Sequence, residues 1–314
     1  MDLKQIEYIV KIAETGSITK AAEQLYITQS ALNQQLLKLE SGLGIKLFYR
    51  HKHDMTLTKA GEVYVKYGKH MLQEKQEAYN IIQDLAKNNL GDLNMTFSRE
   101  RGIDMLIATY PTFHKKFPGM TLKPHEMYVS DQVHQVVKGY SDMGIITLNP
   151  KYRLPELEYF HIRNESMLLA LPRENPLASN AAPPGTYIED LPYMELQKCK
   201  ELPFVLVQEK STMRKIIDES FKANKFSPSL LLESGSIRAL LNMVKNNMVA
   251  TVVASAYYKF QDKIAYYRIP GDPFWELCVV YKKGTYKSKP MKYYQELILQ
   301  YFAEKAPLMS RRKA

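Results

Sequence analysis

The sequence predicts an α+β multidomain fold, with a small helical domain and a wing at the N-terminus, one long helix, and two α/β subdomains at the C-terminus. The first 45 residues carry three short apolar patterns of helical spacing, separated by capping residues and glycines. One longer helical pattern follows, and after residue 90 β-type runs alternate with helices. A chain of 314 residues that is 45% apolar is long enough for more than one core.

Three short helices are expected at the N-terminus. The first covers residues 2–15 and stops at Gly16, and Ser17 is a good N-cap for the second. Thr28 is the N-cap candidate for the third, which Gly42 and Gly44 end. A tight turn between the second and third helices is the layout of a helix-turn-helix unit, here at about residues 18–37.

A wing and a linker helix are expected next. Leu47 and Phe48 can anchor the wing, residues 50–53 form its polar tip, and residues 55–57 read as a return strand, which completes a domain over residues 1–58. The linker helix, residues 59–90, has apolar positions spaced three and four apart over about four heptads, among them Val63, Tyr67, Met71, Ala78 and Leu85. It has no obvious domain of its own to lie on, so we expect it to pair with a second chain.

Residues 91–314 should form two α/β subdomains. A β-α-β-α-β pattern between residues 93 and 148 implies a parallel sheet, and a second unit of this kind follows between residues 166 and 253. The last strands and helix would return to the first unit. Subdomain I would therefore comprise about 91–163 and 268–314, and subdomain II about 164–267. The proline-rich stretch 175–203 is the least ordered by composition.

Several classes of protein are excluded or disfavoured by what the sequence lacks. It has no run of eighteen apolar residues and no secretory signal, so we expect no membrane partner and a cytoplasmic location. The two cysteines form no plausible zinc set. No nucleotide-binding glycine motif, HExxH or GxSxG occurs, which argues against an enzyme, a metal or a cofactor. The net charge of +10 indicates a polyanionic partner only weakly, because the first 90 residues hold 12 basic and 10 acidic residues.

The front of the chain resembles the LysR-type transcriptional regulators. The matching segments are AETGSITKAA at 13–22, TQSALNQQLLKLE at 28–40, LGIKLFYR at 43–50 and LTKAG at 57–61. The remainder is similar to the effector-binding region of that family, through 113–119, 142–145 and 171–178. The resemblance implies a winged helix-turn-helix, a periplasmic-binding-protein-like effector domain, and a tetramer made of two dimers. One departure matters: Asn33 stands where the family usually has serine.

DNA-contacting residues are expected on the third helix and the wing. A recognition helix reads base edges in the major groove with residues near its start. Asn and Gln can make paired hydrogen bonds to adenine, whereas lysine, arginine and the wing tip suit phosphates, and Thr28 is better explained as a cap than as a base reader. The candidates for contact with double-stranded DNA are Thr28, Gln29, Ser30, Asn33, Gln34, Lys38, Arg50 and Lys52.

Effector-binding residues are expected at the ends of strands. Small molecules bind at the carboxyl ends of the strands of such sheets, near helix N-termini. The candidates are Ser98, Arg99, Ser130, Thr147, Gln208 and Ser211, although Ser130 and Ser211 could equally serve as helix caps. Arg99 is the only fixed charge noted in the first loop, so a small organic acid is the favoured effector, with a neutral or amine ligand as the alternative.

We therefore expect a sequence-specific transcription regulator that a small-molecule effector modulates. Two alternatives remain open. One is a helix-turn-helix regulator whose C-terminal domain only oligomerises, and the other is a solute-binding module, for which a helix-turn-helix would be unnecessary. The sequence indicates neither the effector nor the operator, and it does not distinguish an activator from a repressor.

Overall fold

The structure is a computed structural model that describes residues 2–51, 54–86, 90–99, 101–258 and 262–304. The chain forms two compact units. One comprises Met1–Gly91 with Lys138–Tyr140 and Thr285–Ser288, and the other comprises Asp92–Val137, Ser141–Gly284 and Lys289–Ala314. Among the described helices, none combines the length and the apolar character that a membrane span requires.

The N-terminal helices begin and end at the expected signals. Helices α1 (Leu3–Thr15), α2 (Ile18–Gln24) and α3 (Gln29–Leu43) have N-caps at Asp2, Ser17 and Thr28, each of which accepts a hydrogen bond from a backbone N–H of the first turn. Gly16 and Gly44 end α1 and α3 in the left-handed conformation, whereas Gly42, which the sequence also placed at the end of the third helix, lies inside α3. The buried side chains of these helices form one core, which includes Ile6, Ile9, Ala21, Leu32 and Leu36.

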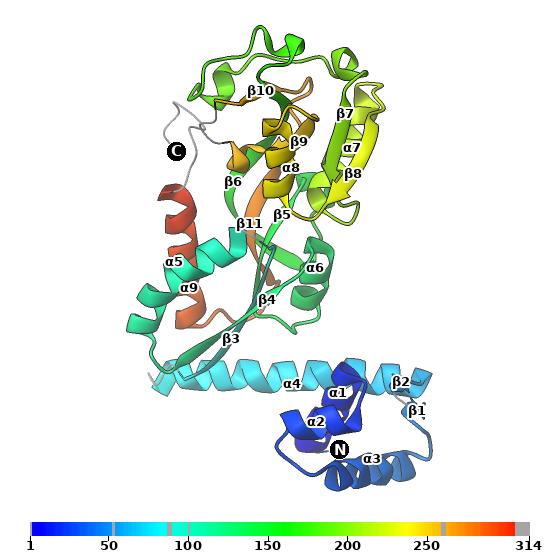
Figure 1. Ribbon diagram of the computed structural model, residues 1–314. Coiled ribbons are helices and arrows are strands. Elements are labelled where there is room, and N and C mark those ends of the chain that lie inside the picture. Colours follow the sequence, from blue (N-terminus) through cyan, green and yellow to red (C-terminus); the bar gives the residue numbers. More distant parts are fainter. Residues whose placement is uncertain (1, 52–53, 87–89, 100, 259–261, 305–314) are drawn as a thin grey trace. The chain divides into compact units, whose positions relative to one another are not determined.

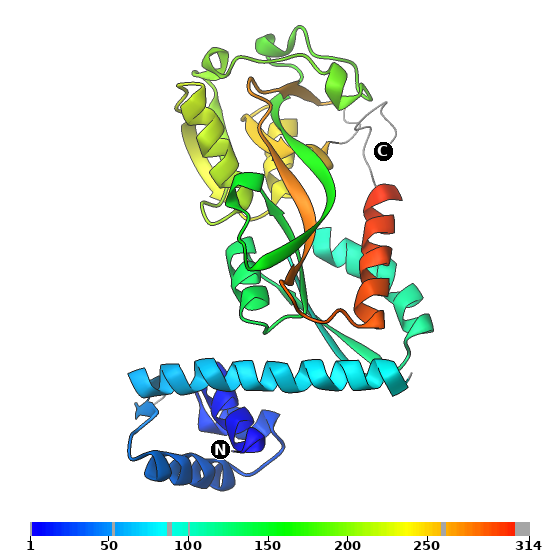
Figure 2. The same ribbon diagram turned by 180° about the vertical axis from the view of Figure 1, so that it is seen from behind.

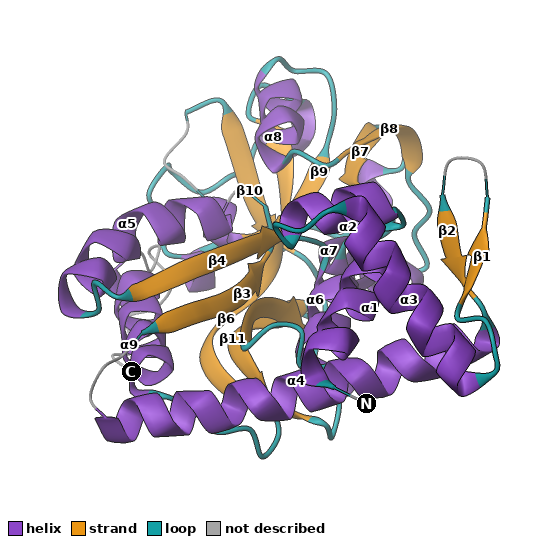
Figure 3. Cartoon of the chain, turned by 90° about the horizontal axis from the view of Figure 1, so that it is seen from below, coloured by secondary structure: helices purple, strands orange, loops and turns teal. Residues whose placement is uncertain are grey.

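The wing and the long helix complete this unit. Strands β1 (Phe48–Arg50) and β2 (Met55–Leu57) pair as an antiparallel hairpin. Helix α4 (Lys59–Ala86) is continuous over 28 residues, as the heptad pattern predicts. Figure 3 shows the β1–β2 hairpin next to α3, the third helix.

The sheet of the second unit is mixed, which corrects the parallel sheet that the sequence predicts. Strand β3 (Gly91–Phe97) is parallel to β5 (Met143–Leu148) and lies between β5 and β4 (Met120–Glu126). Strand β11 (Phe274–Lys282) inserts antiparallel between β5 and β6 (Leu157–Pro172). The first half of β6, residues 157–165, was not predicted, because its residues show neither a clean alternation of polar and apolar side chains nor a continuous apolar run.

Strand β6 continues from one subdomain into the other. Its first half pairs with β11, and its second half pairs with β9 (Thr251–Ala254) and β10 (Ile264–Arg268). Figures 1 and 2 show β6 and β11 running side by side between the two α/β lobes. The two subdomains are therefore joined by strands that cross between them.

Helices cover both faces of the first subdomain. Helices α5 (Arg101–Lys116) and α9 (Lys289–Glu304) pack on one face through Met105, Phe113, Tyr294 and Ile298. Helix α6 (Val129–Val137) covers the other face and packs Val136 against β5 and β11. Helices α5 and α6 begin within four residues of the ends of β3 and β4, the strands that precede them.

The second subdomain has its own core around two parallel strands, β7 (Pro203–Val207) and β8 (Ser229–Ser234), and the helices α7 (Thr212–Ala223) and α8 (Ile237–Lys245). The stretch 175–203 is ordered, contrary to the prediction from composition. It contains the short 3-10 helices Pro176–Ala178, Ile188–Asp190 and Leu196–Cys199, and it buries Ile188, Leu191, Met194, Leu196 and Cys199 in this core. Its apolar residues are spaced too irregularly to show a helical or strand period.

Candidate DNA-binding and effector-binding sites

The predicted DNA-contacting residues of α3 lie within its first three turns. Thr28 is the N-cap and accepts a hydrogen bond from Ala31 N at 3.2 Å, so the capping role is confirmed. Gln29, Ser30, Gln34 and Lys38 are exposed, and Asn33 is half-buried. The opposite face of α3 buries Leu32, Leu36 and Leu39. The helix is therefore anchored on its apolar side and presents amide and hydroxyl groups to solvent.

The wing is fixed to the end of α3 by one buried carboxylate. Glu40 is 3% exposed, and its Oε1 accepts hydrogen bonds from Leu47 N at 2.7 Å and from Phe48 N at 3.3 Å. Thr58 closes the other end of the wing, where its Oγ1 donates to Lys46 O at 2.8 Å and its N–H donates to Leu47 O at 2.9 Å. These contacts set where the wing begins relative to α3.

Gly61 explains one of the sequence motifs in physical terms. A Cβ built on Gly61 would lie 2.0 Å from Leu47 O, so only glycine lets the first turn of α4 approach the base of the wing. The motif at 57–61 therefore seats the wing on α4.

Arg50 and Asn33, predicted as separate DNA contacts, are brought together by the structure. Arg50 ends β1, and its Nη2 donates to Asn33 Oδ1 at 3.1 Å. Lys52, the other predicted contact in the wing, lies outside the described residues, as does His53.

Most of the predicted effector-binding residues line one cavity of about 720 Å³. Ser98, Arg99, Thr147, Gln208 and Ser211 all line it. Ser130 does not, because it lies one residue inside α6 while its neighbours Val129 and Asp131 line the wall.

The first turns of four helices face this cavity. Residues at the starts of α5, α6, α7 and α8 line it, and Ser211 and Ser236 are the N-caps of α7 and α8. Each helix start carries a partial positive charge and has backbone N–H groups without partners in the helix. The arrangement therefore favours a ligand with negative charge or acceptor oxygens.

Arg99 is not the only fixed positive charge near the first loop, which corrects the prediction. Its side chain is 83% exposed and pairs with Glu126 at 3.4 Å. Arg101 also lines the cavity, and its side chain is only 21% exposed. The sequence pointed to the loop but not to Arg101, because Arg101 is the first residue of the following helix.

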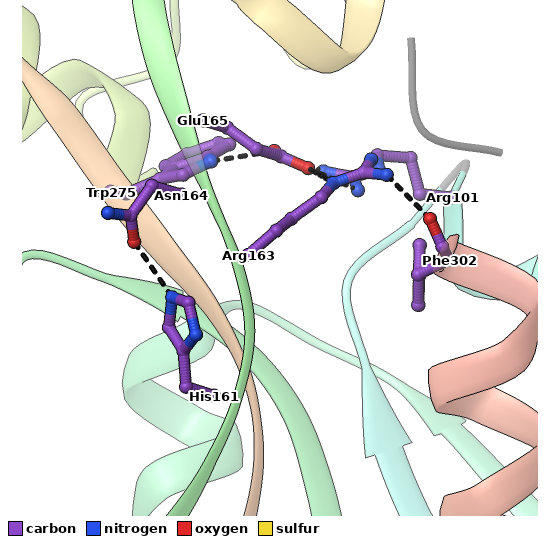
Figure 4. Close-up of polar contacts among 7 residues, drawn as sticks. All are labelled: Arg101, His161, Arg163, Asn164, Glu165, Trp275 and Phe302. Carbon is purple, nitrogen blue, oxygen red and sulfur yellow. Dashed lines mark hydrogen bonds and ion pairs between the residues drawn. The ribbon is translucent and has the colours of Figure 1, made fainter. Parts of the chain in front are cut away.

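Beside the cavity, Arg101 belongs to a buried polar network, drawn in Figure 4. Glu165 is completely buried, and its two oxygens accept hydrogen bonds from both terminal nitrogens of Arg101, from Arg163 Nε and from Trp275 Nε1, all at 2.8 Å. Burial alone would raise the pKa of Glu165, but Arg101, then Arg163 and Trp275, outweigh burial and lower this pKa below its usual value. Two guanidinium groups thus share one carboxylate.

Tyr257, Trp275 and Phe302 also line the cavity and were missed from the sequence. Tyr257 lies on the short helix Ser255–Tyr257, Trp275 on β11 and Phe302 on α9. None of these elements was among the strand ends from which the candidates were chosen. Trp275 is the only tryptophan of the chain, and that was the one available signal. The described residues contain no group of three or more His, Cys, Asp or Glu side chains that could hold a metal ion.

Two family models match this chain along most of its length. Residues 3–62 match the bacterial regulatory helix-turn-helix protein of the lysR family, and residues 87–303 match the LysR substrate binding domain. A probable RuBisCO transcriptional regulator from Cyanophora paradoxa is 26% identical over 318 residues, covering 99% of this chain and 95% of the relative. The HTH-type transcriptional regulator AlsR from Bacillus subtilis is 26% identical over 270 residues, covering 85% of each chain.

Solved structures share the fold over the whole chain. Full-length OxyR from Pseudomonas aeruginosa has a TM-score of 0.71 at 21% identity, covering 100% of this chain and 99% of that one. Full-length CbnR complexed with its target DNA has a TM-score of 0.57 at 20% identity, covering 98% and 100%. The relatives are transcription regulators and not enzymes. The chain therefore belongs to the LysR family, as a DNA-binding transcription regulator with an N-terminal helix-turn-helix domain and a C-terminal effector-binding domain.

Proposed function

We propose that this regulator reads its operator with the exposed amides of α3, namely Gln29, Asn33 and Gln34. The observation that carries this proposal is the one-sided burial of α3, which leaves these amides exposed or half-buried near the helix start. Side-chain amides can donate to and accept from base edges in the major groove. Lys38 lies about one turn beyond Gln34 and is better suited to a phosphate.

The long helix α4 is proposed as the seam of a dimer. Val63, Tyr67 and Met71, at steps of four, are 58%, 56% and 41% exposed. Leaving three large apolar side chains of one stripe in water is unfavourable, so a second copy of α4 is the natural cover. Two such dimers joined through their effector domains would give the tetramer that the family resemblance implies.

The cavity between the subdomains is proposed to bind a small organic anion. Four helix starts converge on it, and the cluster of Arg101, Arg163 and Glu165 beside it has two positive charges for one negative charge. Two acidic residues, Glu126 and Asp131, also line the cavity, so a ligand with a separate amine group is the alternative. Binding would act on transcription by favouring one arrangement of the subdomains, and such a protein would work in the cytoplasm, where the DNA is.

The DNA proposal is tested with full-length protein on a random pool of duplexes, selected for binding and sequenced. Gln29→Ala and Gln34→Ala should each change the selected base at one symmetric position and cost about 1–3 kcal/mol at the wild-type site. Lys38→Ala is the matched control, which should weaken all duplexes alike and reduce the salt slope by about one. If all three variants still select the wild-type site and lose the same amount of binding affinity for it, α3 does not read bases.

The effector proposal is tested by a thermal-shift screen of small carboxylates, phosphates, amines and neutral compounds. A compound that binds the folded chain raises the melting temperature. If no compound of any of these classes shifts the melting temperature, the alternative is favoured in which the C-terminal domain only oligomerises and binds no effector.

A further inference from the structure

We propose that Arg50 and Asn33 act as one composite reader that selects guanine, in which Arg50 both orients the amide of Asn33 and donates to the base. This inference rests on the proposed function of α3. The observation is the hydrogen bond of 3.1 Å from Arg50 Nη2 to Asn33 Oδ1, which links the wing to the recognition helix over 17 positions of sequence. A phosphate contact, the role predicted from the sequence, does not explain why the guanidinium is directed at a side chain of α3.

The contact fixes which end of the Asn33 amide faces outward. A guanidinium has five N–H donors and no acceptor, so only the oxygen of the carboxamide can face it. The Nδ2 amino group of Asn33 must then point away from Arg50. An isolated asparagine offers both a donor and an acceptor to DNA, whereas this one offers its donor and has its acceptor engaged by a cation.

The wing holds Arg50 in this position before DNA binds. Glu40 fixes the start of β1 to the end of α3, and Arg50 is paired with Met55 at the end of the hairpin. No carboxylate of the described residues forms an ion pair with Arg50, so within that part of the chain Asn33 is its polar partner. An exposed hydrogen bond of this kind contributes little to the stability of the free protein. The hydrogen bond becomes stronger where the DNA interface excludes water.

The composite surface selects for acceptors on the base. Adenine presents an acceptor, N7, beside a donor, the N6 amino group, and the donor would meet the N–H groups of Arg50. Guanine presents two acceptors, N7 and O6, which can take hydrogen bonds from Asn33 Nδ2 and from the unused N–H groups of Arg50. The pair therefore reverses the preference for adenine that asparagine alone would give.

The test compares full-length wild type with Arg50→Lys and Asn33→Ala by selection from a random duplex pool and by binding to the selected site. Wild type should select guanine at one symmetric position, with about a tenfold or greater preference over adenine. Arg50→Lys keeps the charge but replaces the planar donor group by a flexible ammonium, so that position should shift to adenine while the other positions stay unchanged. Asn33→Ala should reduce the guanine preference at the same position.

Replacing that guanine by 7-deazaguanine removes the N7 acceptor and provides a second measurement. It should weaken wild type several-fold, while Asn33→Ala, which has no Nδ2 to donate to that N7, should lose less. The proposal is overturned if wild type selects adenine there, or if Arg50→Lys leaves every selected base unchanged. In the latter case the selection would still show whether Gln29 and Gln34 read bases, so failure of the composite reader is distinguishable from failure of α3 as the recognition helix.

Discussion

The hydroxyl of Tyr128 donates a hydrogen bond of 2.5 Å to Gln208 Oε1, which joins the start of α6 in one subdomain to the end of β7 in the other. Both residues line the cavity. Tyr152 makes a second contact between the subdomains, from its hydroxyl to Glu219 of α7. The two subdomains are thus connected by side chains as well as by β6 and β11, and the side-chain contacts can open without breaking the sheet.

Tyr128→Phe should shift the subdomains toward an open arrangement. The lost hydrogen bond is exposed and is therefore worth about 0.5–1.5 kcal/mol, enough to change the open population a few-fold. The change is measured as the distance distribution between spin labels at Lys115 and Lys222, exposed residues of the two subdomains. Tyr110→Phe is the matched control, since Tyr110 stacks on His114 within α5 and a phenyl ring can keep that contact. Identical distributions for wild type and Tyr128→Phe would exclude this role.

Glu165→Gln should destabilise the effector domain by about 3 kcal/mol, because it leaves two half-buried guanidinium groups without their carboxylate. The pKa of Glu165 is lowered in the folded chain, so its stabilisation is present above the pKa of the unfolded chain and is lost as the pH falls through the folded pKa. Acidification should therefore cost wild type more stability than it costs Glu165→Gln.

Denaturant titrations at several pH values measure this difference, with the single Trp275 as the fluorescent reporter inside the network. The control is Glu174→Gln, an exposed glutamate in the same unit, which should follow wild type at every pH. A Glu165→Gln variant with the same acid dependence as wild type would show that this carboxylate is not responsible.

The two cysteines should be unreactive in the folded protein. Burial raises the pKa of Cys199 to about 11, and burial followed by Glu276 raises the pKa of Cys278 to about 12. Because the thiolate is the reactive form, a thiol reagent at pH 8 should modify both only as fast as the chain opens, and completely in guanidinium chloride. Stoichiometric modification of the native protein within seconds would contradict the prediction.

Met71→Glu should break one association step of the full-length protein. A carboxylate placed in an apolar seam is left without a partner and costs several kcal/mol. Sedimentation at tens of micromolar should then show about half the mass of wild type. Gln76→Glu introduces the same group at an exposed position of α4 on a different face from Met71, five residues further along, and should keep the wild-type mass. An unchanged mass for Met71→Glu would place the seam elsewhere.

The elements that carry strong local signals were predictable from the sequence. Ser17, Thr28 and Gly44 determine helix ends through their side-chain and backbone chemistry. The insertion of β11 between β5 and β6 was not predictable, because it is decided by long-range pairing and not by local pattern. Ser98 and Gln208 were placed at the cavity from strand ends, whereas Trp275 is brought there by the way β6 and β11 cross. Arg101 follows the same strand as Ser98, but its contact with Glu165 depends on the long-range placement of β6.

The cavity wall is made largely from residues outside the packed cores. Ser98, Thr147, Gln208 and Ser211 belong to none of the buried clusters that hold the subdomains together. Substitutions at Ser98, Thr147 and Gln208 can change the chemistry of the wall at little cost to folding, whereas Ser211 also caps α7. A scaffold built in this way can acquire a new inducer by a few point mutations, while its architecture is inherited unchanged.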